Sequence, residues 1–74
     1  MEVKKGIRSY IGDAVVKRRI EIKMEQESVC AYADVSITTL STLENGKANI
    51  SLLKLEKILD VLGLEVVIKI KEKV

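Results

Sequence analysis

The sequence predicts a small, mainly α-helical domain of about four to five helices, followed by one C-terminal β-strand. Two patterns support this fold class: apolar residues recur at helical spacing as far as Leu62, and at every second position after Gly63. The 74 residues contain no linker-like or low-complexity stretch, so we expect one domain. Its predicted parts are an N-terminal arm at 1–8, a helical domain at 9–63 and a dimerisation strand at 64–74.

Composition and charge argue against several classes of function. Thirteen Lys and Arg residues oppose eleven Asp and Glu residues, and a net charge of +2 does not by itself indicate a nucleic-acid binder. One Cys and no His argue against a disulfide, a zinc site and a His-based catalytic triad. Because no glycine loop for phosphates and no plausible pair of acids is present, we predict no enzymatic activity, no metal and no cofactor. Without a signal peptide or a long apolar run, we expect a cytoplasmic protein with no membrane contact.

The first two predicted helices precede a tight turn. A helix from about Ser9 to Lys23 is expected because Ile11, Val15 and Ile22 share one face. A shorter helix, "EQESVCAYA", begins with acidic residues that suit the positive end of a helix dipole. Its inward-facing residues are predicted to be Val29, Cys30 and Ala33. Asp34 follows and is expected to form the turn, since Asp tolerates a left-handed backbone.

Two further helices follow the turn. Ser36 can cap a third helix at 37–44, and Gly46 can adopt the positive φ that ends it. Ser51 is placed to cap a fourth helix at 52–62, which carries the strongest apolar stripe of the chain. The third helix has small hydroxyl residues between its apolar positions, and these are poor helix formers. We therefore expect its exposed face to be needed by something outside the protein.

The predicted strand has no obvious partner within the chain. Its apolar side consists of alternate residues, namely Leu64, Val66, Ile68 and Ile70. A lone strand leaves backbone donors and acceptors unpaired, so it requires a second strand. A two-fold axis would supply an identical strand from a second chain, and association also suits a domain with so small a core. The alternative partner is the N-terminal segment "MEVKKGI".

Two short helices joined by a tight turn are the layout of a helix-turn-helix. From Ile11 to about Leu64 the chain resembles the Xre family of phage-repressor-like domains, in "MEQESVC", "ADVS", "TLSTLENGK" and "SLLKLEKILDVLGL". The resemblance implies a lambda-repressor-like bundle. The C-terminal strand is similar to that of HipB-type antitoxins. The chain departs from the family at Glu25, where a Ser or Thr cap is usual, and at Asp34, where Gly is usual in the turn.

The third helix is the predicted recognition helix. Such a helix lies in the major groove of DNA and contacts base edges with its outward side chains. The predicted base-contacting residues are Ser36, Ile37, Thr38, Ser41 and Thr42. The resemblance matches Ile37, Thr38 and Thr42 to base-contacting positions of the family. The alternative is that this face is merely solvated.

Other polar residues are predicted to contact DNA phosphates. The resemblance assigns Gln26 to one phosphate clamp and Asn45 with Lys47 to a second clamp. The start of the second helix also suits an anion on physical grounds, although Glu25 places a carboxylate beside it. Lys17 and Arg18 are weaker candidates, because a charged helix face is usually only solvated.

Arg19 and Glu44 have a different predicted role. The resemblance implies that they form a largely buried ion pair between the first and third helices. The alternative for Arg19 is that it contacts a phosphate.

These features predict a sequence-specific DNA-binding transcriptional regulator, encoded by a bacterium or a phage. We expect a homodimeric repressor whose partner is double-stranded DNA with an inverted-repeat operator. One alternative is an antitoxin that represses its own operon and also binds a toxin protein. Another is a protein-interaction adaptor that does not bind DNA.

Overall fold

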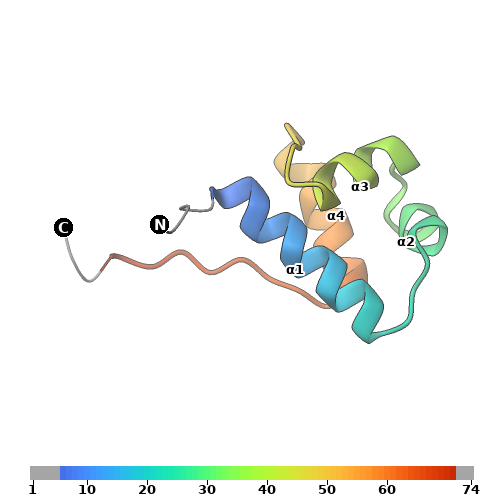
Figure 1. Cartoon of the computed structure of the whole chain (residues 1–74), viewed down its shortest axis with the longest axis horizontal. Coiled ribbons are helices and arrows are strands. Elements are labelled where there is room, and N and C mark those ends of the chain that lie inside the picture. Colours follow the sequence, from blue (N-terminus) through green and yellow to red (C-terminus); the bar gives the residue numbers. More distant parts are fainter. Residues whose placement is uncertain (1–5, 72–74) are drawn as a thin grey trace, which may run out of the picture.

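The computed structural model of the chain describes residues 6–71, which form four α-helices (Figure 1). These are α1 (Ile7–Glu21), α2 (Gln26–Ala33), α3 (Ile37–Glu44) and α4 (Leu52–Leu62). α1 and α2 each pack against both α3 and α4. The predicted bounds of α3 and α4 agree with the structure, and α2 begins one residue later than the motif that predicted it. No strand occurs within 6–71, so only the helical part of the predicted fold class is observed.

Each helix contributes to one small apolar core. The largest fully buried side chains come from all four helices; they are Val15, Val29, Leu40, Leu43, Ile58 and Leu62. Leu40 and Leu43 lie three residues apart on α3, so one narrow face of this short helix is buried. The opposite face of α3 therefore remains available for contacts outside the protein.

All four helices end in a left-handed turn. Lys23, Asp34, Gly46 and Gly63 have positive φ angles of 58°, 56°, 74° and 69°. At each end a following amide donates back into the last turn, as in a Schellman motif. Asp34 and Gly46 therefore have the conformations predicted for them. Lys23 explains why α1 ends at Glu21 rather than at the predicted Lys23: the Met24 amide donates to the Arg19 carbonyl at 3.0 Å. α1 also begins at Ile7, two residues before the predicted start.

Gly12 allows α1 and α3 to approach closely. A Cβ atom at this position would clash with the carbonyl oxygen of Leu43, and that oxygen is part of the backbone and cannot rotate away. Gly12 is buried in the middle of α1. The glycine is therefore required by packing against the end of α3.

The C-terminal segment, defined as residues 64–71, is extended but forms no ladder with another described part of the chain. The predicted strand is therefore not observed in the single chain. Its suggested N-terminal partner is in part helical, because α1 begins at Ile7, and residues 1–5 lie outside the described range. Leu64 packs against the core, whereas Ile68 and Ile70 are 94% and 95% exposed. Among the described helices, none is both long and apolar enough to cross a bilayer.

Candidate nucleic-acid interface

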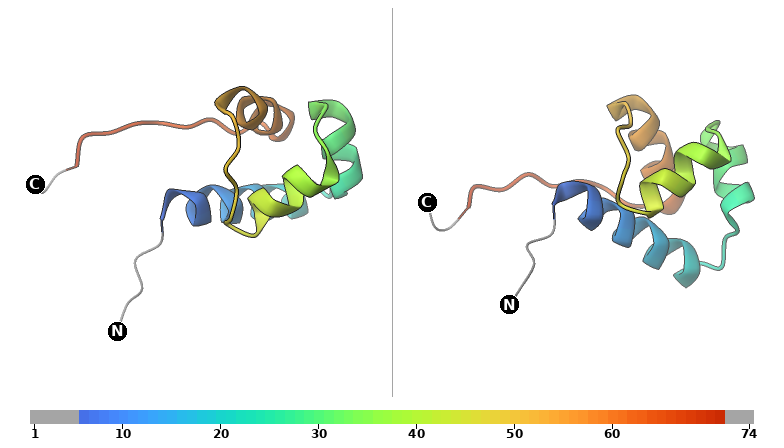
Figure 2. Two further views of the ribbon diagram at one scale, coloured as in Figure 1. Left: turned by 90° about the horizontal axis from the view of Figure 1, so that it is seen from above. Right: turned by 45° about the horizontal axis from the view of Figure 1, so that its top comes forward.

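α2, the turn at 34–36 and α3 form a helix-turn-helix. The left-handed Asp34 ends α2, the partly buried Val35 packs against the core, and Ser36 starts α3. The Ser36 hydroxyl accepts a hydrogen bond from the Thr39 amide at 3.1 Å, so it caps α3 as predicted. In Figure 2, α2 and α3 lie at the end of the molecule opposite to the one from which the C-terminal segment extends.

The predicted base-contacting residues lie on the outer side of α3 and at its start. Ser36, Ile37 and Thr38 are exposed, with 46% of the Ile37 surface accessible, while Ser41 and Thr42 are half-buried. The Ser36 hydroxyl also lies 2.9 Å from Thr39 Oγ1. The Ser36 and Thr39 hydroxyl groups therefore bind each other at the start of the helix, whereas those of Thr38, Ser41 and Thr42 are not part of this contact.

A groove runs between α3 and the start of α4. It has a volume of about 290 Å³ and is lined by Thr38, Thr39, Thr42, Ala48, Asn49, Ile50, Ser51 and Lys54. Asn49 and Lys54 were not predicted from the sequence. Both are exposed and come from the loop after α3 and the first turn of α4. Only the folded chain brings these two residues beside Thr38 and Thr42.

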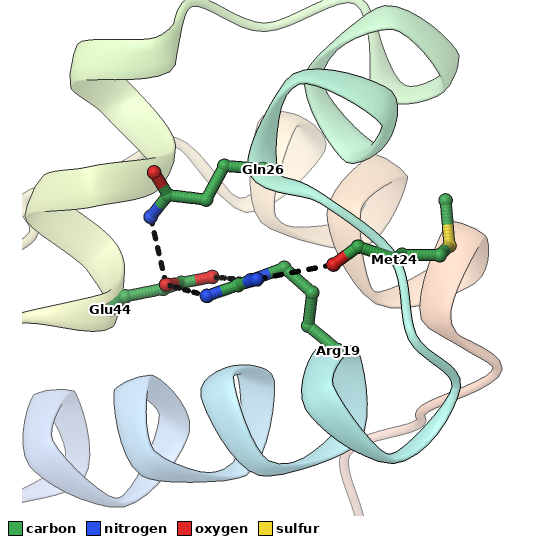
Figure 3. A network of polar contacts seen from close by, with 4 residues as sticks. All are labelled: Arg19, Met24, Gln26 and Glu44. Atoms are coloured by element: carbon green, nitrogen blue, oxygen red, sulfur yellow. Dashed lines mark hydrogen bonds and ion pairs between the residues drawn. The ribbon is translucent and has the colours of Figure 1, made fainter.

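Arg19 and Glu44 form a bidentate ion pair between α1 and α3 (Figure 3). Arg19 Nε donates to Glu44 Oε2 at 2.7 Å, and a terminal nitrogen of Arg19 donates to Oε1 at 3.0 Å. The other terminal nitrogen donates to the Met24 carbonyl at 3.1 Å. The two side chains are only 18% and 7% exposed, and the hydrogen bond to Glu44 raises the pKa of Arg19. This pair is the one that the family resemblance implied, and it leaves Arg19 little capacity for a phosphate.

Gln26 joins the same network. Its side-chain nitrogen donates to Glu44 Oε1 at 2.9 Å, so one carboxylate holds both Arg19 and the first residue of α2 (Figure 3). The side chain of Glu25, the residue before α2, makes no capping hydrogen bond. The first amides of α2 therefore have no side-chain acceptor from Glu25 and can donate hydrogen bonds to a ligand beside Gln26. The contact between Gln26 and Glu44 was not foreseen from the sequence.

The remaining predicted phosphate contacts differ in their surroundings. Asn45 and Lys47 are exposed just after α3, and Lys17 is exposed on α1. Arg18 instead donates from Nε to the Leu62 carbonyl at 2.9 Å and pairs with Glu21 at 2.8 Å. Its guanidinium thus binds the last turn of α4, which differs from the phosphate role predicted for it.

Cys30 lies in the core rather than in a site. It is buried, and burial followed by the nearby Glu27 raises the pKa of its thiol, which disfavours the reactive thiolate. Within residues 6–71, no group of three His, Cys, Asp or Glu side chains is placed to hold a metal ion.

Comparisons with known proteins agree with this geometry. A family model described as helix-turn-helix matches residues 15–68. The control protein C.MunI of Mycoplasma sp is 42% identical over 59 residues, which are 78% of this chain and 80% of that protein. A point variant of the restriction-modification controller protein C.Esp1396I is 26% identical, with a TM-score of 0.71 over 78% of this chain and 75% of that one. A structure named MDT Protein shares the fold, with a TM-score of 0.80 at 21% identity over 96% of this chain and all of that one.

The matched region contains the whole α2–turn–α3 unit and the ion pair partner Glu44. The resemblance seen in the sequence is therefore confirmed by the family model and by a relative of nearly the same length. The chain belongs to the Xre-like helix-turn-helix family, and it is a sequence-specific DNA-binding regulator of transcription.

Proposed function

We propose that the protein is a homodimeric repressor that binds an inverted-repeat operator and controls the genes of a restriction-modification system. The last part rests on the relatives, because C.MunI is named a control protein and C.Esp1396I a restriction-modification controller. A restriction endonuclease or methyltransferase gene beside this reading frame would support this assignment. Since these relatives are controllers, we do not propose a toxin partner.

The outer face of α3, with its exposed and half-buried hydroxyl groups, is the observation that carries the proposal. In the proposed complex, Ile37, Thr38, Ser41 and Thr42 contact base edges in the major groove, and Ser36 contributes from the start of the helix. Hydroxyl groups donate or accept hydrogen bonds, and the methyl groups of Thr and Ile can meet the methyl group of thymine. The Arg19–Glu44 pair supports this role by fixing α3 against α1.

Phosphate contacts are proposed on both sides of the recognition helix. Gln26 and the free amides of α2 would hold one phosphate, since a helix start carries positive partial charge and unpaired donors. Asn45 and Lys47 would hold a second phosphate after α3, and Lys17 would add charge from α1. Arg18 is left out because the Leu62 carbonyl already occupies its Nε.

Dimerisation is proposed to occur through the C-terminal segment. Beyond Leu64, its amides and carbonyls have no backbone hydrogen-bond partner among the described residues, and its large apolar side chains are exposed. A second copy would supply both missing partners, namely a strand and an apolar surface. Such a dimer presents two copies of α3 to the same DNA.

Selection of binding sites from random DNA, followed by mobility shifts on the selected sequence, tests the DNA part of the proposal. We expect an inverted repeat whose half-sites are about one helical turn, ~34 Å, apart. A chain with Ile37, Thr38 and Thr42 all replaced by Ala is the control and should select no sequence. Recovery of an unrepeated site would contradict the dimer, and failure to enrich any sequence would favour an adaptor that does not bind DNA.

A further inference from the structure

We infer that two copies of the C-terminal segment pair as antiparallel strands with Val67 of each copy on the two-fold axis. This inference rests on the proposed homodimer and adds the register of its interface. The register decides which side chains meet and hence which copies can associate.

The C-terminal segment is accessible to a second copy. In Figures 1 and 2 the segment extends beyond the helices at the end of the molecule where α1 starts. This end is opposite to α2 and α3. Ile68 and Ile70 are almost fully exposed, and no ladder joins this segment to another part of residues 6–71. A partner strand can therefore reach the segment without covering the recognition helix.

Alternation of side chains restricts the possible registers. Apolar residues of the segment occupy one side, and Glu65, Val67, Lys69 and Lys71 occupy the other. In a two-fold antiparallel pair, an axis between two residues would set the apolar side of one strand beside the charged side of the other. Only registers with a residue on the axis keep the two apolar sides together.

An axis at Val67 matches the charges. It places Glu65 opposite the partner's Lys69, and the two-fold axis repeats this pair on the other side of Val67. Directly opposite side chains of unlike charge stabilise an antiparallel ladder, and like charges destabilise it. All three residues are exposed in the single chain, so their pairing requires no rearrangement of the core.

The same axis matches the apolar residues. It places Leu64 opposite the partner's Ile70, and Val66 opposite the partner's Ile68. In this way every apolar residue on this side of the segment faces another apolar residue. Cross-strand pairs of β-branched residues are among the favourable contacts in sheets.

Neighbouring registers match less well. With Val66 on the axis, Glu65 would face the partner's Val67 and lose its opposite charge. With Ile68 on the axis, Glu65 would still face a lysine, the partner's Lys71, but Lys69 would face the partner's Val67 and Leu64 would have no opposite residue within 64–71. With Lys69 on the axis, two lysines would meet each other. The register at Val67 is thus the one that satisfies both sides of the ribbon.

The apolar side of the ribbon continues a surface of the helical body. Leu64, Val66 and Ile68 line a mostly apolar hollow of about 530 Å³, whose other lining residues are Glu65 and residues of α1 and α4, among them Glu56 and Asp60. The helix residues that form its apolar wall are Ile7, Ile11, Leu52, Leu55 and Leu59. Because Ile7 and Leu52 are 71% and 82% exposed, this wall is open in the single chain. In the proposed two-stranded ribbon, the partner's Ile70 lies opposite Leu64 and so adds apolar surface to this wall in each copy.

Charge exchange tests the register. Glu65→Lys alone places lysine against the partner's Lys69, and Lys69→Glu alone places glutamate against the partner's Glu65. Sedimentation equilibrium should show each variant dimerising about ten-fold more weakly or worse, with unchanged helical circular dichroism. An equimolar mixture of the two variants should form a heterodimer with the affinity of the wild-type dimer, since both of its cross-strand pairs again have unlike charges. Homodimers as tight as wild type, or a mixture as weak as the single variants, would overturn the register.

Disulfide trapping gives an independent test. Val67→Cys places two thiols on the axis, at a distance that a disulfide can span. The control is Glu65→Cys, whose two thiols would be separated by about 13 Å along the ladder and should not bond. Mild oxidation should therefore trap the first variant as a dimer and not the second. A trapped dimer of Ile68→Cys in place of Val67→Cys would overturn this register.

The outcomes also separate the register from the dimer itself. A wild-type chain that sediments as a monomer at all concentrations tested would refute both. A wild-type dimer that neither traps at Val67 nor responds to the charge exchange would refute the register and leave the homodimer standing.

Discussion

The eight residues of α3 differ in how far they are buried. Leu40 and Leu43 are fully buried, while Thr38 is exposed and Thr42 lines the groove beside α4. Replacing Thr38 or Thr42 by Ala should weaken binding to the selected operator by ~1–3 kcal/mol, because a base contact is lost. Mobility shifts on operator and random DNA measure this effect. Equal losses on both DNAs would show that these residues do not discriminate bases.

Lys47 should act on all DNA sequences alike. It is exposed after α3, and a phosphate contact carries no sequence information. Lys47→Ala should lower the slope of log affinity against log salt by about one, since one fewer counterion is released. Lys47→Arg is the matched control, because it keeps the charge. If the slope of the Ala variant equals that of the Arg variant, Lys47 does not contact a phosphate.

Glu44 holds two residues at once, so its loss should affect the fold. Glu44→Ala leaves the Arg19 guanidinium without its partner and removes the acceptor of Gln26. We expect a loss of ~3 kcal/mol in the free energy of unfolding, at the lower end for a buried pair because Arg19 keeps some contact with solvent. Urea denaturation measures this loss. Replacing both Arg19 and Glu44 by Met should cost less than Glu44→Ala alone, since no unpaired charge remains.

Residue roles could be predicted from the sequence only where a local pattern or a family resemblance pointed to them. Ser36 and Ser51 cap the helices predicted for them, because a cap is decided within four residues. The Arg19–Glu44 contact followed from the resemblance and from nothing in the pattern itself. Gln26 and its partner Glu44 are separated by 18 positions in the sequence, and Arg18 and its partner Leu62 by 44 positions. No local sequence signal indicates these hydrogen bonds.

Among the secondary-structure elements, a helix end could be predicted from the sequence where a glycine marks it. α3 and α4 end where Gly46 and Gly63 supply the left-handed residue, and glycine is the usual choice there. α1 ends earlier than expected because Lys23 takes the same conformation without that signal. The C-terminal segment has the period of a strand, but a ladder needs a second strand that residues 6–71 do not provide.

Gly12 is the position where one added methyl group should separate two helices. In an isolated helix, Gly→Ala would stabilise by about 1 kcal/mol. In this protein the new Cβ would meet the Leu43 carbonyl, so we expect Gly12→Ala to destabilise by ~1–3 kcal/mol. Thermal unfolding measures the change. Gly6→Ala is the matched control, since within residues 6–71 no atom beyond its chain neighbours lies within 4 Å of its added Cβ. A more stable Gly12→Ala variant would show that α1 can shift away at little cost.

For the whole molecule, the helical body and the C-terminal segment should be separable. The buried core lies within α1–α4 and the loop before α4, so a chain cut after Gly63 should keep most of its helical circular dichroism. It should sediment as a monomer and lose orders of magnitude in operator affinity, because the second half-site is no longer held at high local concentration. Ile68→Lys in the full chain should act in the same direction. A truncated chain that still dimerises would place the dimer interface on the helices.

The hydrogen bond from Arg18 to the Leu62 carbonyl lies just before the start of the C-terminal segment. Together with the turn at Gly63, where an added Cβ atom would lie 3.6 Å from the Arg18 guanidinium, it fixes the direction in which the segment leaves α4. In a dimer joined by this segment, it also fixes how each α3 is turned relative to the other. One base pair inserted between half-sites rotates one of them by roughly 34° about the DNA axis, since a turn contains ~10.5 base pairs. If the segment leaves α4 in a fixed direction, the two recognition helices of the dimer cannot turn to match that rotation. For the proposed dimer, the helical phase between the half-sites would therefore be part of what the protein recognises, at base pairs that none of its side chains touches.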